Sequence, residues 1–223
     1  MKRGGLRISV CSDNGSWMNE YIPELMLEWI KKGYEVRWAY DIAQIPDSDM
    51  CFYLNYGKIV PVDSLKKHQN NLVVHESDLP EGRGWSPLIW QILERKKLIP
   101  ITVFEASEEV DSGQIYFQKW ISFDGSELVD ELRKKQAQTS IILCSTFVNT
   151  YFDVIRKARP EHGISTYYPR RTPKDSKIDL DKTIRKQINL LRVADNNRYP
   201  IWFELKGKKI ALIIRESDLS RIQ

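Results

Sequence analysis

Six runs rich in β-branched and aromatic residues alternate with helical segments over the first 160 residues, and this alternation constrains the fold most. The runs cover residues 6–11, 35–40, 50–54, 71–75, 99–105 and 115–122. Strands that alternate with helices usually form a mainly parallel sheet with helices on both faces. The pattern therefore predicts an α/β fold built on such a sheet.

Three segments between or after these runs have apolar residues at helical spacing. The first is 17–32, which Gly33 ends, and the second is 87–97. The third covers 126–158 and is long enough that we expect an interruption or a split.

The character of the chain changes near Pro160. Residues 160–182 are rich in Pro, Arg, Asp and Lys and predict a long ordered loop, which a helix over 181–193 follows. Residues 201–205 and 209–215 flank Gly207 in a β-hairpin pattern. We therefore predict a main domain over residues 1–160 and a small appendage over 161–223 that packs against it.

The composition is that of an ordinary globular protein, with 42% hydrophobic and 29% charged residues. No run approaches the roughly 18 apolar residues of a membrane span, and a strand-like run begins too early for a signal peptide. The three cysteines, Cys11, Cys51 and Cys144, are widely spaced, which favours reduced buried thiols over disulfides or a zinc site. We expect a cytoplasmic protein without a metal.

The net charge of +4 is small, and basic residues are interleaved with acidic ones. Short basic clusters at 31–32, 95–97 and 133–135 are interpreted as solvated helix faces. A surface for nucleic acid needs a denser basic stripe. The charge therefore predicts no nucleic-acid partner and at most a small anionic ligand.

A histidine at one strand end and an aspartate in a later turn form the strongest candidate site. His75 ends a predicted strand and opens the Pro/Gly-rich sequence HESDLPEGRGWSPL, whereas Asp111 lies in the turn VDSG. Such a pair suits proton transfer, because imidazole has an unperturbed pKa of about 6.5. The alternative for His75 is a core histidine that caps a strand end.

These motifs resemble the active site of the formyltransferases that use N10-formyltetrahydrofolate. The matching residues are His75, Ser77, Leu79 and Pro80, followed by a glycine-rich loop and the acidic turn at 110–113. The resemblance implies a Rossmann-like formyltransferase core over residues 1–160 that binds folate, with the C-terminal loop, helix and hairpin as an appendage. It also implies an N-formyltransferase that needs the folate donor and no metal.

One position departs from the family pattern. The family has an asparagine two residues before the histidine, where this chain has Val73, and the nearest asparagine on that run is Asn71. Valine cannot donate a hydrogen bond to an oxyanion. Asn55, at the end of the neighbouring strand, is a candidate substitute, and backbone N–H groups are another.

The resemblance implies that His75 takes a proton from the attacking amine and returns it to the leaving nitrogen. Asp111 would orient the ring and favour its charged form. Loss of the asparagine leaves two alternatives open. One is a catalytically weak protein that binds folate or a nucleotide sugar, and the other is a hydrolase of the formyl donor.

The resemblance also implies two groups of binding residues. The folate pocket would be formed by Tyr56, Gly57, Lys58 and Ile59 on one side and by Ser107, Glu108 and Val110 on the other. Asn14, Gly15 and Ser16 open a helix and would bind a phosphate or sugar oxygen, unless Ser16 is a simple cap. The other predicted substrate residues are Ser77, Arg83, Trp85, Tyr168, Arg170 and Arg171.

The two consecutive arginines, Arg170 and Arg171, would clamp a diphosphate, or else brace their loop through ion pairs. The sequence is most similar to sugar N-formyltransferases of the pseudaminic-acid type, whose substrate is UDP-4-amino-4,6-dideoxy-N-acetyl-altrosamine. This implies a UDP- or dTDP-linked amino sugar as substrate, no membrane partner, and a possible homodimer. Another amine, on an aminoacyl group or glycinamide ribonucleotide, remains the alternative.

Overall fold

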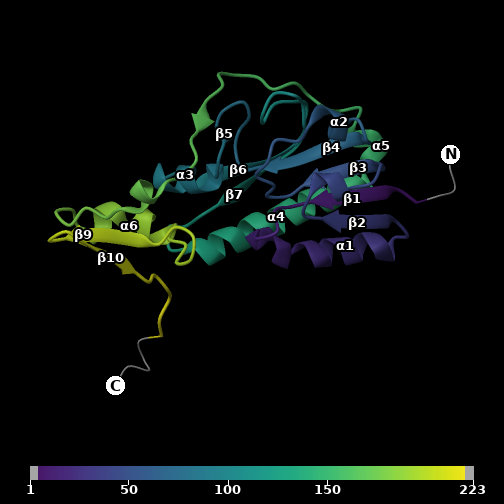
Figure 1. Cartoon of the computed structure of the whole chain (residues 1–223). Coiled ribbons are helices and arrows are strands. Elements are labelled where there is room, and N and C mark those ends of the chain that lie inside the picture. The colour runs from purple at the N-terminus through teal and green to yellow at the C-terminus, as the bar shows by residue number, and fades with distance from the viewer. Residues whose placement is uncertain (1–4, 219–223) are drawn as a thin grey trace.

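A computed structural model describes residues 5–218, and its centre is a six-stranded sheet in the order β2-β1-β3-β4-β6-β7 (Figure 1). The first four strands are parallel, whereas β6 and β7 are antiparallel to their neighbours. The mainly parallel α/β fold is therefore confirmed. The strand bounds are β1 Arg7–Cys11, β2 Glu35–Ala39, β3 Ser48–Tyr53, β4 His68–His75, β6 Leu98–Glu105 and β7 Ile115–Ser122.

The direction of β6 decides how the acidic turn reaches the histidine. Leu72 pairs with Glu105 and His75 with Thr102. The last residue of β6, Glu105, therefore lies beside Leu72, three residues away from His75 along β4. At about 3.3 Å per residue, the loop after β6 starts about 10 Å from His75. It must fold back over the sheet face to bring Asp111 close.

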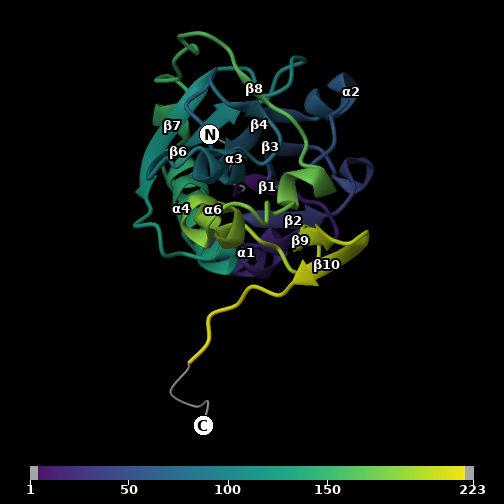
Figure 2. The same ribbon diagram turned by 90° about the vertical axis from the view of Figure 1, so that its left-hand side faces the viewer.

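Helices cover both faces of the sheet (Figure 2). On one face lie α1 (Ile22–Lys31) and α4 (Val129–Asn149), and Trp29, Phe52 and Phe147 from α1, β3 and α4 form an aromatic group. The other face carries η2 (Ile42–Gln44) and α2 (Val62–Leu65). Burial of the large apolar side chains on these faces supplies the main driving force for folding.

The predicted helices are present with shorter bounds. The first divides into η1 (Trp17–Glu20) and α1. The second is α3 (Pro87–Leu93), which ends there because Arg95 adopts a positive φ of 68°. The third divides at Thr150 into α4 and α5 (Tyr151–Val154), so the expected split is confirmed.

The C-terminal segment lies at one end of the sheet (Figure 1). Its elements are β8 (Tyr167–Tyr168), η3 (Pro173–Ser176), α6 (Ile184–Arg192), β9 (Ile201–Leu205) and β10 (Lys208–Leu212). The last two strands form the predicted antiparallel hairpin. The loop contains more structure than the sequence indicated, because β8 pairs with β5 (Arg83–Gly84) beside the histidine loop.

Two ion pairs join this segment to the start of α4. Arg192 on α6 donates to the Glu127 carboxylate at 3.0 Å, and Arg133 on α4 donates to Asp195 at 2.6 Å. Arg192 and Glu127 are almost fully buried. Arg133 was predicted to lie on a solvated helix face. It is instead partly buried and paired with Asp195, so the interpretation of the 133–135 cluster is wrong for this residue.

The three cysteines are free and buried, as predicted. None of the helices within residues 5–218 combines the length and the apolar character needed to span a membrane.

Candidate active site

His75 is the last residue of β4 and is 6% exposed. Its Nε2 lies 2.9 Å from the carbonyl oxygen of Gly82 and 3.9 Å from the Asp111 carboxylate. A carbonyl can only accept, so Nε2 must carry a hydrogen. The structure therefore brings the two predicted residues together and fixes which ring nitrogen is protonated.

Asp111 acts on the ring less directly than the sequence suggested. Its carboxylate accepts a hydrogen bond from the backbone N–H of Gly84 at 2.7 Å. The ring is held by Gly82, two residues earlier in the same loop. Asp111 therefore fixes the loop that orients the ring, and it adds a negative charge 3.9 Å from Nε2.

Two glycines make this arrangement possible. Gly113 has a φ of +139°, and a Cβ there would lie 1.9 Å from the carbonyl oxygen of Glu105. Gly84 has a φ of +98°, and its Cβ would lie 2.4 Å from the carbonyl oxygen of Tyr168. Both positions combine a backbone conformation that favours glycine with close approach of another segment.

We expect Gly113→Ala to displace the acidic turn from His75. The added Cβ must move either the turn or the end of β6, and a misplacement of about 1 Å can cost about 10²-fold in rate. Assays of the formyl transfer that the motifs imply should show this loss. Gly207→Ala is the matched control, since Gly207 also has a positive φ but an open space around it. Equal activity of the two variants would contradict the prediction.

A cavity of about 880 Å³ lies at this end of the sheet and contains the His75–Asp111 pair. All predicted folate residues line it, as do four of the predicted substrate residues. These are Tyr56, Gly57, Lys58, Ile59, Ser107, Glu108 and Val110 from the first set, and Ser16, Trp85, Arg170 and Arg171 from the second.

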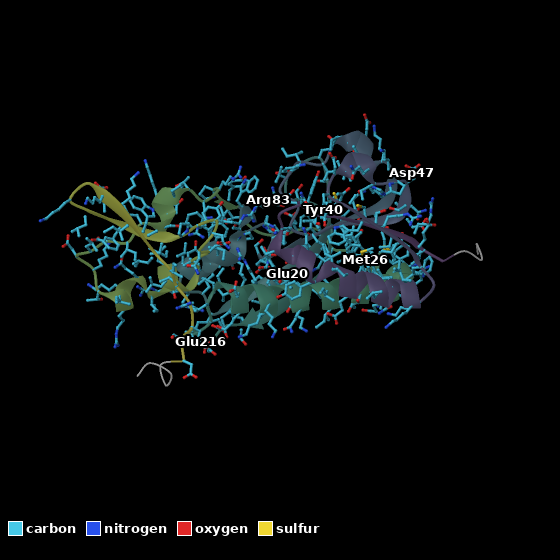
Figure 3. All side chains as sticks on the ribbon, turned by 60° about the horizontal axis from the view of Figure 1, so that its bottom comes forward. Glu20, Met26, Tyr40, Asp47, Arg83 and Glu216 are labelled. Carbon is cyan, nitrogen blue, oxygen red and sulfur yellow. The ribbon has the colours of Figure 1, made fainter. Side chains whose placement is uncertain are left out.

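Five predicted substrate residues do not line the cavity. Asn14 and Gly15 lie outside it, and Ser77 is buried in the protein. Arg83, labelled in Figure 3, forms ion pairs with glutamates of two other loops. The Tyr168 hydroxyl donates to Glu94, and its ring stacks on Trp90. Arg83 and Tyr168 therefore hold the loop in place, which is the physical reason that they are not available to a ligand in the cavity.

The asparagines near the site have different environments. The Asn71 amide is occupied, since it donates to the Leu65 carbonyl and accepts from the Tyr53 hydroxyl. Val73 lines the cavity where the family has its asparagine. Asn55 also lines the cavity and donates to the Ser16 hydroxyl at 2.7 Å. Its role as an oxyanion donor stays a prediction.

Ser16 caps η1 by accepting from the backbone N–H of Met18, as the simpler alternative predicted. The helix that it opens is a four-residue 3-10 turn. Such a short turn supports only a small dipole, because the macrodipole sums over aligned peptide units.

The two consecutive arginines do not brace their loop through ion pairs. Arg170 stacks on Trp85 at 4.9 Å, and Arg171, 6% exposed, stacks on Tyr199 at 4.9 Å. Within residues 5–218, neither these two nor Arg198 forms an ion pair, although all three line the cavity. Burial lowers the pKa of Arg171, and its Nε has no hydrogen-bond partner among the described residues.

Sequence reasoning missed other residues that line the cavity, namely Glu76, Arg133, Gln136, Asp195, Arg198 and Tyr199. Glu76 had a visible signal, since it is a charged residue directly after His75 at the end of a hydrophobic strand. The others lie on α4 or in the C-terminal segment, and nothing in their local sequence marks them.

Residues 40–148 match the family model described as formyl transferase. A methionyl-tRNA formyltransferase from Thermodesulfovibrio yellowstonii is 31% identical over 169 residues, which cover 72% of this chain and 52% of that protein. The chain thus spans about half the length of this relative.

Solved structures show the same fold. A methionyl-tRNA formyltransferase from Clostridium thermocellum has a TM-score of 0.78 at 20% identity, with 95% of this chain and 100% of that chain covered. A sugar N-formyltransferase from a Shewanella species has a TM-score of 0.68 at 19% identity, covering 96% and 99%. HypX from Aquifex aeolicus in complex with tetrahydrofolic acid has a TM-score of 0.75 at 17% identity, covering 94% and 37%.

The chain therefore has the α/β fold of these solved structures. The family model matches residues 40–148, just under half of the chain, and this match agrees with the resemblance drawn from the motifs around His75 and Asp111.

Proposed function

We propose that the chain transfers a formyl group from N10-formyltetrahydrofolate to the amine of a nucleotide-linked 4-amino-4,6-dideoxy sugar. One observation carries the proposal. A single cavity joins the His75–Asp111 pair to Arg170, Arg171 and Arg198, which form no ion pair within the described residues. A proton-transfer pair and a group of free cations suit an amine acceptor that carries phosphates.

The proton transfer would use the second nitrogen of the His75 ring. Because Nε2 donates to Gly82, the neutral ring presents Nδ1 as its basic nitrogen, and Nδ1 has no hydrogen bond to another described residue. Nδ1 would take the proton that the attacking amine loses and return it to the leaving nitrogen. The Asp111 carboxylate would stabilise the imidazolium formed between these steps.

The donor side of the cavity fits a flat apolar ring system. Ile59 and Val110 are apolar residues of the two facing loops, yet they are 77% and 45% exposed. Apolar side chains exposed in a cavity gain free energy when a ligand covers them. The structural neighbour in complex with tetrahydrofolic acid supports a folate-derived ligand. Bound there, N10-formyltetrahydrofolate supplies the formyl group.

The acceptor side fits a diphosphate. A buried guanidinium without a carboxylate is costly, and an anionic ligand would offset this cost through charge-assisted hydrogen bonds. Arg171 has one unpaired N–H group and faces the same cavity as Arg170 and Arg198. Structural neighbours named as sugar N-formyltransferases support a nucleotide sugar as the acceptor.

Formyl transfer to methionyl-tRNA is the second candidate, which the sequence relatives favour. To separate the two, the protein would be incubated with N10-formyltetrahydrofolate and, separately, UDP- and dTDP-linked 4-amino sugars or methionyl-tRNA. Release of tetrahydrofolate that depends on a sugar supports the proposal, and release that depends on tRNA supports the second candidate. Release without an acceptor indicates hydrolysis and contradicts both.

We expect Arg171→Gln to raise the KM for the nucleotide sugar by about 10- to 100-fold, because a charge-assisted hydrogen bond is worth about 1.5–3 kcal/mol. The KM for the folate donor should not change. Lys174→Gln, at an exposed position of η3 in the same segment, is the control for a lost positive charge. A rise in both KM values would show that Arg171 only supports the fold.

A further inference from the structure

Glu76 is a partly buried carboxylate that lines the cavity, and the proposed proton transfer does not use it. It follows His75 directly, so its side chain lies on the other side of the β4 end. Gln136 on α4 donates to its Oε1 at 2.6 Å, and Gln91 on α3 donates to its backbone carbonyl. Neutral amides therefore fix the position of this residue without neutralising its charge.

No cation is paired with this carboxylate among residues 5–218. Arg133 lines the same cavity, but it is paired with Asp195 and lies over the Trp17 ring. No other described residue donates a hydrogen bond to the carboxylate, so that only Gln136 and the backbone N–H of Glu76 itself bear on it. Burial raises the pKa of Glu76, and the neighbouring His75 opposes this rise. A desolvated carboxylate that lacks a cation is costly unless a ligand supplies one.

Glu76 and His75 are consecutive residues at the end of β4, but their surroundings differ. A small recess beside Glu76 is lined by Trp17, Asn55 and Gln136, whereas His75 on the opposite side contacts Gly82 and Asp111. An amine held by Glu76 would thus lie at the strand end that also carries the catalytic imidazole. The amine is the cationic group of the proposed acceptor.

We propose that the Glu76 carboxylate binds the acceptor amine in its ammonium form, takes up the proton that must leave before the neutral amine can attack, and so selects an amine over a hydroxyl group as the acceptor. This inference rests on the proposed function and goes further, because it assigns the residue that recognises the reacting group. Gln136 is the positioning residue that holds Oε1.

The test compares two nucleotide sugars that differ at one atom. One is UDP-4-amino-4,6-dideoxy-N-acetyl-altrosamine, and the other carries a hydroxyl in place of the 4-amino group. Their Kd values for the wild type and for Glu76→Gln would be measured by calorimetry without the formyl donor. The substituted amide has the same size and can still accept from Gln136, and thermal unfolding would confirm that the variant is folded. Glu20→Gln is the control, an exposed glutamate labelled in Figure 3.

We expect Glu76→Gln to weaken binding of the amine by about 10- to 100-fold and to leave the hydroxyl compound within about twofold. Equal loss for both compounds, or no loss for the amine, would overturn the role of Glu76 while the proposed function stands. If the wild type binds neither compound, nor their dTDP counterparts, the proposed acceptor fails and this inference fails with it.

Discussion

Replacing His75 with asparagine is expected to lower formyl-transfer turnover by about 10²- to 10⁴-fold, the usual contribution of general acid–base catalysis. The asparagine amide can still donate to the Gly82 carbonyl, so the loop should keep its place. It has no group that can take a proton from the amine. Steady-state rates and binding of tetrahydrofolate would be measured together, and binding should remain.

His68→Asn is the matched control, because His68 lies on the same strand and is similarly buried, but contacts Ser48 away from the cavity. Any effect of this control should follow its thermal stability and not the chemical step. Turnover of His75→Asn close to that of the wild type would remove the imidazole from the mechanism.

Glu127→Gln is expected to lower the free energy of unfolding by about 3–5 kcal/mol, because it leaves a buried charge without its partner. Glu127 pairs with Arg192 and Lys135, and it accepts from the backbone N–H groups of Asp124 and Gly125. Arg192 is 5% exposed and cannot turn to solvent without moving α6. Urea unfolding at pH 7 would measure the loss.

The same residue predicts a dependence of stability on pH. Burial raises the pKa of Glu127, but the hydrogen bonds from Lys135 and from backbone N–H groups outweigh it and lower the pKa from 4.5 to about 2. A carboxyl group whose pKa is lowered by folding contributes stability above its unfolded pKa, and the contribution is lost as pH falls through its folded pKa. The wild type should lose this contribution between about pH 4.5 and pH 2, whereas Glu127→Gln should not.

Glu204→Gln is the control for this experiment, since Glu204 forms an exposed ion pair with Lys177 in the same segment. Exposed pairs contribute about 0–1 kcal/mol. Equal destabilisation by the two substitutions would show that the Glu127–Arg192 pair does not anchor the segment.

The strands of the sheet could be predicted from the sequence because each is a short run of β-branched and aromatic residues. The direction of β6 and β7 could not, since the same composition serves parallel and antiparallel pairing. This matters for the site, because the antiparallel β6 forces the Asp111 loop back over the sheet. The pairing of β8 with β5 was also hidden, since two-residue strands have no periodicity.

The site could be predicted where local motifs mark it. His75 and Asp111 stand out beside their glycines, and the loops at 56–59 and 107–110 follow strands. Gln136 and Arg133 lie on α4 among many polar residues, and their partners Glu76 and Asp195 are about 60 residues away in the chain. Contacts over such distances are set by packing of the whole fold and leave no local pattern.

The short pairing between β5 and β8 joins the loop that holds the His75 ring to the segment that leads to Arg170 and Arg171. The Gly82 N–H donates to the Thr166 hydroxyl, 84 residues later, while the Gly82 carbonyl holds the imidazole. Tyr168 continues into Arg170 and Arg171. A nucleotide that displaces these arginines on binding would therefore also displace Gly82, whose carbonyl orients the His75 ring. In the proposed function, binding of the nucleotide and the orientation of the His75 ring would therefore be coupled through this strand pair.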